Sequence, residues 1–487
     1  MSLHIYDTKR CKKVPFEPLE PGRVKMYVCG ITAYDYCHIG HARSALVFDM
    51  IAAYLRYLHY DVTYVRNFTD IDDKIINRAN EQGTTSEALA NRFIDEFYTD
   101  MNALGVAAPD IEPKATDHIP EIISLIENLI DNGLAYQSGH DVYFRVNKFA
   151  TYGALSRRNI EDMQAGARIA VSEKKYNPMD FALWKGSKPG EPTWDSPWGP
   201  GRPGWHIECS AMSKKYLGDS FDIHGGGEDL VFPHHENEVA QSEGASGKTF
   251  VKYWIHHAFV TISDEKMSKS LNNFLTIRDV LKHHDPEALR LMVFTTHYRN
   301  PLDFSDTTLL EAQAGINRLY NCISDCAQLP DGKPSVPQVA TNEERSKLQN
   351  LESRFKEAMD NDFNTAQALG TVFEAVKTIN RIKQALPKKP AIQDIDLLRE
   401  TALTITSLAD ILGLLRRNPD EYFKDQQTKH LTAIDMTESE LQQLIDDRNI
   451  ARAHKDWSKA DQIRDLLLEK NIELKDDPQG TTWKISS

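Results

Sequence analysis

Two histidines three positions apart, His38 and His41, end a glycine-containing run at residues 30–41. The run follows an apolar segment at 24–28 that predicts a buried strand, and it precedes residues 42–59, whose apolar pattern predicts a helix. A strand, a tight turn and a helix N-terminus make a site where backbone N–H groups can hold phosphate. Both imidazoles can also donate hydrogen bonds to phosphate oxygens. The run is therefore a candidate nucleotide site, and a pair of polar surface histidines is the alternative.

A second polar segment, residues 266–270, carries two lysines and two serines directly after a polar turn at 263–265. Such a cationic loop can close on a polyphosphate and neutralise charge as the leaving group departs. Lys266 and Lys269 are the candidate phosphate contacts, and a solvated surface loop is the alternative.

These two segments, in this order, resemble those of class I aminoacyl-tRNA synthetases, and within that class the chain resembles the cysteinyl-tRNA synthetase family. The resemblance covers essentially the whole chain. Its further motifs are residues 27–32, 67–74, 203–209, 222–230, 232–238 and 297–305. The resemblance implies an ATP-dependent ligase that activates L-cysteine as cysteinyl-adenylate and transfers it to the 3′ end of tRNA(Cys).

The 487-residue chain has 41% hydrophobic and 26% charged residues, which is typical of a globular protein of roughly three domains. Its net charge of −14 has the wrong sign for binding nucleic acid through bulk charge. Binding of tRNA must then depend on basic residues confined to one face, on shape, or on contacts with bases. No long apolar run and no signal-like start is present, so we expect no membrane span and a cytoplasmic protein. The six cysteines lack framework spacing, which favours free thiols or metal ligands.

Strand and helix patterns alternate over residues 24–115, which predicts the first half of a doubly wound parallel sheet in a multidomain α/β protein. The alternation stops at about 116 and returns at about 196, and helical periodicity dominates from about 306. The expected domains are a Rossmann-like catalytic domain (1–115 and 196–255), a connective insertion (116–195), a region with the lysine segment and tRNA-stem contacts (256–305), a helical-bundle tRNA-binding domain (306–417) and a small C-terminal anticodon-recognition domain (421–487).

Apolar stripes of helical period predict four helices in the second half of the chain, at 309–327, 342–360, 364–386 and 395–412. Residues 418–432 are polar, and we expect a mobile segment there. Thr437 and Glu440 have the spacing of a capping box that begins a further helix.

Two cysteines, a histidine and a glutamate form a candidate metal site. Cys29 ends the first predicted strand, Cys209 opens a predicted helix, and His234 and Glu238 share one helix face. Thiolates with imidazole select zinc, but scattered ligands leave a purely structural role open. The resemblance implies one zinc ion held by these four residues. Zinc would bind the cysteine thiolate and would bind the neutral serine hydroxyl weakly, so it would select the substrate.

The resemblance also implies roles for single residues and a Mg²⁺ ion that accompanies ATP. The implied catalytic residues are His38, His41, Lys266 and Lys269. The implied ATP-binding residues are these four with Gly30, Gly40, His224, Gly226, Asp229 and Ser268. The implied cysteine-binding residues are Cys29, Gly30, Thr69, Trp205 and His234; core packing and a strand-end cap are the alternatives for Trp205 and Thr69.

The C-terminal part would read the tRNA, although residues 421–487 are themselves acidic. Arg448, Arg452, Trp457 and Arg464 lie in one predicted helical pair and can offer a cationic, stacking surface to unpaired bases. Two solvated helices are the alternative interpretation.

Two rival functions remain open at this level. A ligase that couples cysteine to a small amino-sugar acceptor would share the nucleotide and zinc motifs, but it is expected to lack the full C-terminal domain. A non-catalytic, zinc-bearing RNA-binding protein is expected to have lost His38, His41 or Lys269, and all three are present. The small C-terminal domain is compatible with a monomer.

Overall fold

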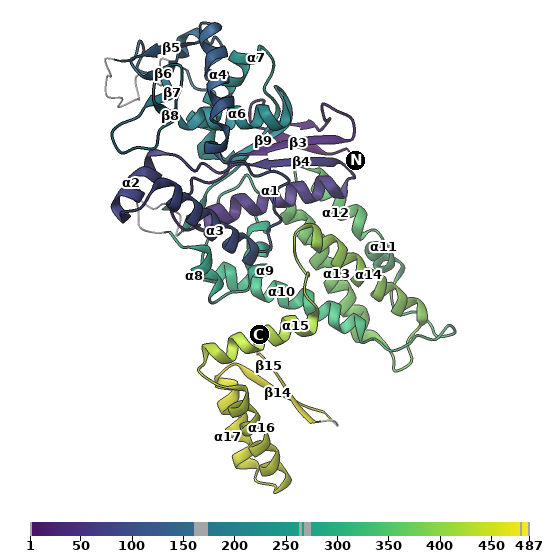
Figure 1. The fold of residues 1–487 in the computed structure, drawn as a ribbon. Coiled ribbons are helices and arrows are strands. Elements are labelled where there is room, and N and C mark those ends of the chain that lie inside the picture. The colour runs from purple at the N-terminus through teal and green to yellow at the C-terminus, as the bar shows by residue number, and fades with distance from the viewer. Residues whose placement is uncertain (1, 160–173, 263–264, 267–273, 478–479, 486–487) are drawn as a thin grey trace. The chain divides into compact units, whose positions relative to one another are not determined.

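The computed structural model describes residues 2–159, 174–262, 265–266, 274–477 and 480–485 (Figure 1). The chain divides into two compact units, and each is described by itself. Unit 1 consists of Met1–Leu309, Asn350–Val372 and Ile411–Gly413, and unit 2 consists of Leu310–Gln349, Phe373–Asp410 and Leu414–Ser487.

The centre of unit 1 is a parallel four-stranded sheet, as the sequence predicts. Its strand order is β10-β9-β3-β4, with β3 (Arg23–Val28), β4 (Asp61–Arg66), β9 (Phe221–Gly227) and β10 (Val251–His257). Every residue of β9 is buried, which suits a parallel sheet covered on both faces. Helix α1 (Ile39–Tyr57) makes the crossover from β3 to β4 and buries most of its side chains (Figure 1). The polar residues that follow each strand therefore gather at one edge of the sheet.

Further helices of unit 1 pack around this sheet. They are α2 (Asp73–Gln82), α3 (Ser86–Ala103), α6 (Trp205–Leu217), the short turns η3 (Glu228–Leu230) and η4 (Val231–His235), α7 (Glu236–Ser246), α8 (Ile277–Leu281), α9 (Pro286–Phe294) and α12 (Leu351–Asp360). Two small sheets complete the unit: β1 (His4–Asp7) with β2 (Lys12–Pro15), and β11 (Val260–Ile262) between β12 (Glu265–Lys266) and β13 (Leu302–Asp303).

The chain between β4 and α6 builds a small subdomain with its own core. It comprises η1 (Ala115–His118), α4 (Ile119–Asp131), η2 (Val146–Lys148) and an antiparallel sheet of β5 (Ala135–Ser138), β6 (Asp141–Phe144), β7 (Phe181–Gly186) and β8 (Gly201–Pro203). Ile122, Phe144 and Trp184 are fully buried in this core. The sheet continues to Pro203, beyond the boundary at 195 expected from the sequence, because β8 pairs with β7.

Most of the remaining chain is helical. The helices are α10 (Asp306–Ala327), α11 (Asn342–Gln349), α13 (Thr365–Ala385), α14 (Ile392–Ile411), α15 (Pro419–Ala433), α16 (Glu438–Ala453) and α17 (Trp457–Glu469), followed by the hairpin β14 (Ile472–Asp477) and β15 (Gly480–Ile485). The predicted capping box is present, because Thr437 accepts from the Glu440 N–H and Glu440 reaches back to the Thr437 N–H.

Two predictions in this region were wrong. The single helix expected over 342–360 is two helices, α11 and α12, which separate at Asn350. The mobile segment expected at 418–432 is α15, which Asn418 caps through the Asp420 N–H, with Pro419 in its first turn. Its Tyr422 ring is fully buried and stacks on Tyr320 with centroids 3.9 Å apart. The Tyr422 hydroxyl also bonds Gln313 and Asn317, and Leu431 of α15 is buried, so tertiary contacts support a helix whose apolar stripe is weak.

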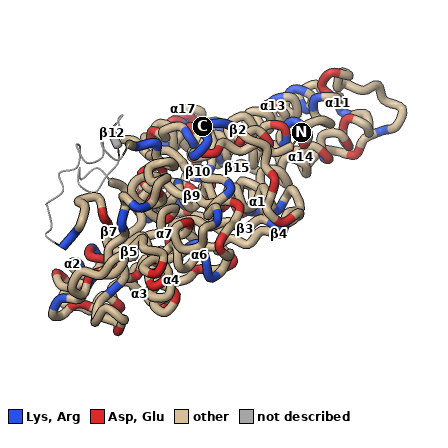
Figure 2. The backbone as a smooth tube through the Cα atoms, turned by 90° about the horizontal axis from the view of Figure 1, so that it is seen from above, with Lys and Arg blue, Asp and Glu red and all other residues tan. Residues whose placement is uncertain are grey.

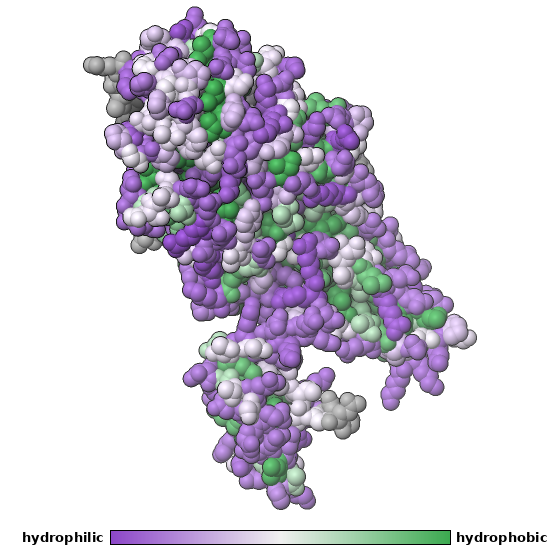
Figure 3. Space-filling model, viewed as in Figure 1, coloured by the Kyte–Doolittle hydropathy of each residue, from purple (hydrophilic) through white to green (hydrophobic). Residues whose placement is uncertain are grey.

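The charged residues follow no single pattern along the backbone. Figure 2 shows Lys and Arg positions interspersed with Asp and Glu positions in the strands and helices alike. The face seen in Figure 3 is mostly hydrophilic with separate hydrophobic patches. Within the described residues, no helix combines the length and apolar character that crossing a membrane requires.

Candidate active site

The four predicted zinc ligands come from four elements of unit 1 that meet at the carboxyl edge of the central sheet. Cys29 directly follows β3, Cys209 lies in α6, His234 lies in η4 and Glu238 lies in α7. Their donor atoms lie within 4.8 Å of one another. Cys209, His234 and Glu238 are buried, and Cys29 is half-buried.

The spacing of this cluster fits a metal ion. The Cys29 and Cys209 sulfurs are 3.7 Å apart. A disulfide would hold them at about 2.05 Å, whereas two thiolates bound at about 2.3 Å to a tetrahedral zinc ion are about 3.8 Å apart. The Glu238 Oε1 atom is 3.4 Å from the Cys29 sulfur and 3.0 Å from His234 Nε2. Two thiolates, an imidazole and a carboxylate are also a donor set that zinc accepts.

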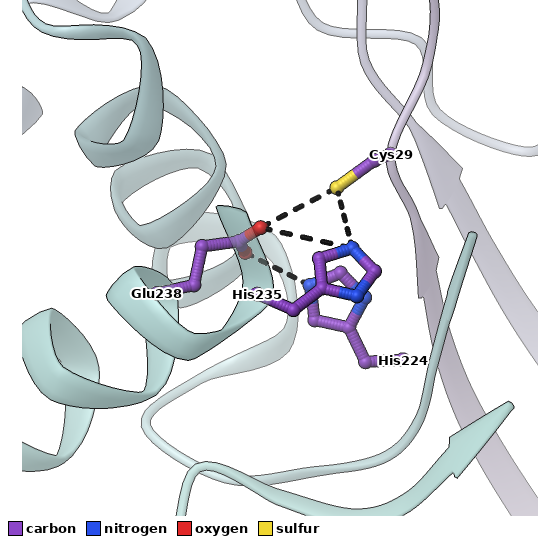
Figure 4. Close-up of side chains that lie close together, drawn as sticks. All are labelled: Cys29, His224, His235 and Glu238. Carbon is purple, nitrogen blue, oxygen red and sulfur yellow. Dashed lines mark hydrogen bonds and ion pairs between the residues drawn. The ribbon is translucent and has the colours of Figure 1, made fainter. Parts of the chain in front are cut away.

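A second group of donors overlaps with the first and was not foreseen from the sequence. It consists of Cys29, His224, His235 and Glu238, which Figure 4 shows pointing toward one another. His235 Nε2 is 3.3 Å from the Cys29 sulfur, and His224 Nε2 is 2.8 Å from Glu238 Oε2. The adjacent histidines at 234 and 235 were the only sequence signal for this group.

His224, which the sequence predicts as an adenosine contact, lies in this second group, and its contact with ATP stays a prediction. The His224 side chain is fully buried, bonds Glu238, and stacks on Trp254 with ring centroids 4.6 Å apart. It therefore orients the Glu238 carboxylate, which is how partners of metal ligands commonly act.

The charges of the cluster follow from burial and from its neighbours. Burial raises the pKa of the Cys29 thiol well above its usual value, while the hydrogen bond from Cys29 lowers the pKa of Cys209 to about 6. Burial opposes the charged forms of Glu238 and His234, but their neighbours outweigh it. Attraction and hydrogen bonds from His224 and His234 lower the pKa of Glu238 to about 2, and those from Glu238 and Cys209 raise the pKa of His234 to about 10. At neutral pH Cys209 is then a thiolate and Glu238 a carboxylate, which are the forms that bind zinc, whereas His234 must lose its proton before it binds the ion.

Neutral histidines surround this charged centre. His206 Nδ1 is 2.9 Å from His234 Nδ1, and His235 Nδ1 is 2.8 Å from His256 Nε2. Burial lowers the pKa of His206 and His235 well below the usual value and that of His256 to about 3. These rings therefore act as hydrogen-bond partners that hold the orientation of His234 and His235.

The two histidines of the first motif cap α1. His38 Nδ1 accepts from the Gly40 N–H at 3.0 Å, and His41 Nδ1 accepts from the His38 N–H at 3.1 Å. The rings stack with centroids 3.8 Å apart. An imidazole whose Nδ1 accepts a hydrogen bond carries its proton on Nε2. Both rings are therefore fixed as Nε2–H donors at a helix N-terminus, where an anion is favoured.

Two of the predicted binding positions, Gly30 and Gly226, leave little space for a side chain. A Cβ atom at Gly30 would lie 1.6 Å from the Asn67 carbonyl oxygen, and the Gly30 N–H donates to Asn67 Oδ1 at 3.0 Å. A Cβ atom at Gly226 would lie 2.9 Å from Leu230. Asp229 lines a cavity of about 570 Å³ that also borders Thr8 and His256. Gly30 and Gly226 therefore allow close packing of the backbone, and Asp229 borders the open cavity.

The predicted cysteine-pocket residues Thr69 and Trp205 lie beside the cluster. Trp205 is 37% exposed, and its ring centroid is 4.4 Å from that of His234. Thr69 is buried and its hydroxyl donates to Glu208 Oε2 at 3.0 Å. The partly exposed Trp205 ring thus lies next to His234, a predicted metal ligand. The Thr69 hydroxyl is fixed by its hydrogen bond to the buried Glu208 carboxyl group.

The lysine segment is described only in part. The Lys266 backbone belongs to β12, whereas Ser268 and Lys269 lie outside the described residues, so their predicted contacts with ATP are not placed.

The predicted tRNA residues fall into two groups. Arg448 is 8% exposed and donates with both Nη atoms to Asp476 at 2.9 Å, and Arg452 pairs with the same carboxylate. Arg464 pairs with Asp461 and Asp465. Trp457 is 59% exposed at the start of α17. Arg448 therefore also ties α16 to β14, while Trp457 is open for stacking.

Comparison with known proteins places this site in a class. The family described as "tRNA synthetases class I (C) catalytic domain" matches residues 15–314, and the family described as "DALR domain" matches residues 354–416. A Mycobacterium tuberculosis methionyl-tRNA synthetase in complex with methionyl-adenylate shares the fold at a TM-score of 0.61 and 18% identity, over 80% of this chain and 90% of that one. The chain belongs to the class I aminoacyl-tRNA synthetases.

Proteins with similar sequences identify the family within this class. A cysteine–tRNA ligase of Desulfotalea psychrophila is 60% identical over 100% of this chain and 99% of its own length. A cysteine–tRNA ligase of Geobacter sulfurreducens is 54% identical over 100% of both chains. The chain belongs to the cysteine–tRNA ligase family.

Proposed function

We propose that this enzyme activates L-cysteine with ATP and transfers it to the 3′ end of tRNA(Cys). The observation that carries this proposal is the cluster of Cys29, Cys209, His234 and Glu238 beside the capped N-terminus of α1. A thiol-selecting site next to an anion-binding helix end serves both substrates of the first step.

One zinc ion would be held by Cys29, Cys209, His234 and Glu238. When bound, it would supply selection of the cysteine thiolate over the serine hydroxyl. A hydrophobic pocket discriminates poorly between such similar side chains. Trp205 closes one side of the amino-acid site, and His206 fixes the ring of His234.

The chain's own residues then act on the phosphates. The Nε2–H groups of His38 and His41 donate to the α-phosphate region as the cysteine carboxylate attacks the α-phosphorus and pyrophosphate leaves, which gives cysteinyl-adenylate. Lys266 and Lys269 hold the β- and γ-phosphates, and Mg²⁺ accompanies ATP. Positioning and charge stabilisation carry most of such a reaction. In the second step the tRNA ribose hydroxyl attacks the activated carbonyl, and AMP leaves as the cysteinyl ester forms.

The Trp457→Ala variant is expected to lower kcat/KM for tRNA charging about 10- to 100-fold, because one base–aromatic stack contributes about 1–3 kcal/mol. Cysteine-dependent pyrophosphate exchange is expected to stay at the wild-type level, since that step needs no tRNA. Ile450→Ala is the matched control, because Ile450 is exposed to a similar extent on α16. Equal charging by the two variants would contradict a role of Trp457 in tRNA binding.

The experiment that tests the function is aminoacylation of a tRNA transcript with the cysteine anticodon, with cysteine and serine in parallel. Charging with cysteine and none with serine supports the proposal. Pyrophosphate exchange without charging of any tRNA would favour the ligase with a small amino-sugar acceptor. Absence of both activities would favour the non-catalytic RNA-binding protein. We also propose a monomer in the cytoplasm; light scattering of the purified protein and fractionation of cells test these two points.

A further inference from the structure

A buried arginine on α1 bonds the backbone just before two of the strands that lie next to the lysine segment. Arg43 lies two residues after His41 and is 1% exposed. Its Nη1 donates to the Phe259 carbonyl oxygen at 2.6 Å, and its Nη2 donates to the carbonyl oxygens of Tyr298, at 3.1 Å, and Asn300. One guanidinium thus joins the histidine-bearing helix to two separate backbone segments.

These carbonyl groups lie where β11 and β13 begin. Phe259 directly precedes β11, and Asn300 lies two residues before β13. The two strands run parallel, with the Leu302 N–H donating to the Phe259 carbonyl oxygen at 3.0 Å. Strand β12, which contains the Lys266 backbone, pairs with β11. Arg43 therefore holds the base from which the chain continues into the lysine segment.

The Arg43 guanidinium fixes the position of backbone carbonyl groups and does not form a hydrogen-bonded pair with a carboxylate among the described residues. Among the described residues, its hydrogen bonds go to carbonyl oxygens. Burial lowers its pKa to about 10, so the group stays charged at neutral pH. A charged donor makes stronger and more directional hydrogen bonds than a neutral one. Its planar fork reaches two backbone segments at once, which a lysine ammonium cannot do.

The segment that carries Tyr298 is also held from its other side. Asp362 accepts from the Tyr298 hydroxyl at 2.7 Å and from Arg299 Nε at 2.8 Å, and it accepts from the Tyr6 N–H at 2.8 Å. The sequence motif at 297–305 thus has a structural role as a rigid support between Arg43 and Asp362. Both contacts lie within unit 1.

We propose that Arg43 is a positioning residue for the ATP-dependent step: it fixes the strands that lead to Lys266 and Lys269 relative to His38 and His41. The inference rests on the proposed function, in which both groups act on one triphosphate. Misplacement of catalytic groups by about 1 Å can cost roughly 100-fold in rate. The second step, which uses no triphosphate, does not depend on this alignment.

The test compares the two half-reactions of the Arg43→Lys variant. We expect kcat of cysteine-dependent pyrophosphate exchange to fall roughly 10- to 100-fold. The KM for cysteine and the single-turnover transfer of cysteine from preformed adenylate to tRNA are expected to stay within about twofold of wild type. Wild-type protein assayed first separates the two proposals, because absence of exchange there counts against the function and not against Arg43.

The matched control is Arg290→Lys. Arg290 is equally buried in α9 and pairs with Asp49 of α1. It also donates to the carbonyl oxygens of Leu104, at 2.9 Å, and Leu412, at 3.1 Å, and none of these three partners lies in or beside β11 or β13. We expect this variant to lose thermal stability without a difference between the half-reactions. Hydrogen exchange should quicken in residues 259–262 and 298–304 for Arg43→Lys and not for Arg290→Lys.

Three results would overturn the proposal: unchanged exchange kcat in Arg43→Lys, equal loss in both half-reactions, or the same split in Arg290→Lys. If Arg43→Lys does not fold, Asp362→Asn replaces it, since it weakens the hold on the same segment from the other side. The same split between half-reactions is then expected, and its absence overturns the proposal.

Discussion

The Cys209→Ser variant is expected to lose both its zinc and its activity with cysteine. Purified wild-type protein should contain about one zinc per chain and the variant much less. Cysteine-dependent pyrophosphate exchange should fall at least about 100-fold, because removing even an outer partner of a metal ligand typically costs 10- to 100-fold. The reason is chemical: with its pKa lowered to about 6, Cys209 is a thiolate at neutral pH, whereas a serine hydroxyl stays protonated and binds zinc weakly.

The control for this variant is Cys11→Ser. The Cys11 sulfur lies outside the cluster and donates to the Thr8 carbonyl oxygen at 3.2 Å, a bond that a serine hydroxyl can replace. Its zinc content and exchange rate should match wild type. Full zinc content and full activity in Cys209→Ser would show that the cluster is structural and would remove the basis for thiol selection.

The His38→Asn variant is expected to lose activity while keeping its stability. Asparagine is among the best helix N-caps, so it can replace the acceptor that His38 Nδ1 offers to the Gly40 N–H. It does not replace the Nε2–H donor. Loss of one donor to a developing charge typically costs about 100- to 1,000-fold in kcat, and we expect pyrophosphate exchange to fall by that factor.

His38→Ala separates the two roles of this residue. It removes cap and donor together, so it should lower the free energy of unfolding by about 1 kcal/mol in addition to the loss of activity. Thermal melts beside exchange assays measure both quantities. An active His38→Asn variant would mean that His38 only caps α1 and that His41 alone contacts phosphate.

Local signals let the sequence predict several parts of the molecule correctly. The predicted strand and the predicted helix after the glycine turn are present as β3 and α1. The predicted capping box at Thr437 is also present. The i,i+4 spacing of His234 and Glu238 likewise placed both near one face, and they contact each other at 3.0 Å. These features depend on residues within a few positions of one another.

Local signals failed where a distant contact decides the structure. Residues 342–360 carry a continuous apolar stripe of helical period, yet the helix is interrupted at Asn350. The boundary between the two compact units falls at the same position. Residues 418–432 look like a polar linker, yet the burial of Tyr422 against Tyr320 orders them as α15. In each case packing outweighs local propensity.

By itself the sequence determined the class of fold, the family and the residue types of the site. Only the tertiary structure decided which of the site residues contact one another. Cys29 and Cys209 are 180 positions apart, and their sulfurs come to 3.7 Å because parallel strands end at one edge of the sheet and α6 packs there. The same packing brought His224 against Glu238, and it gave Arg43 its three carbonyl partners. Contacts of this kind depend on the order of strands in space, which no local pattern encodes.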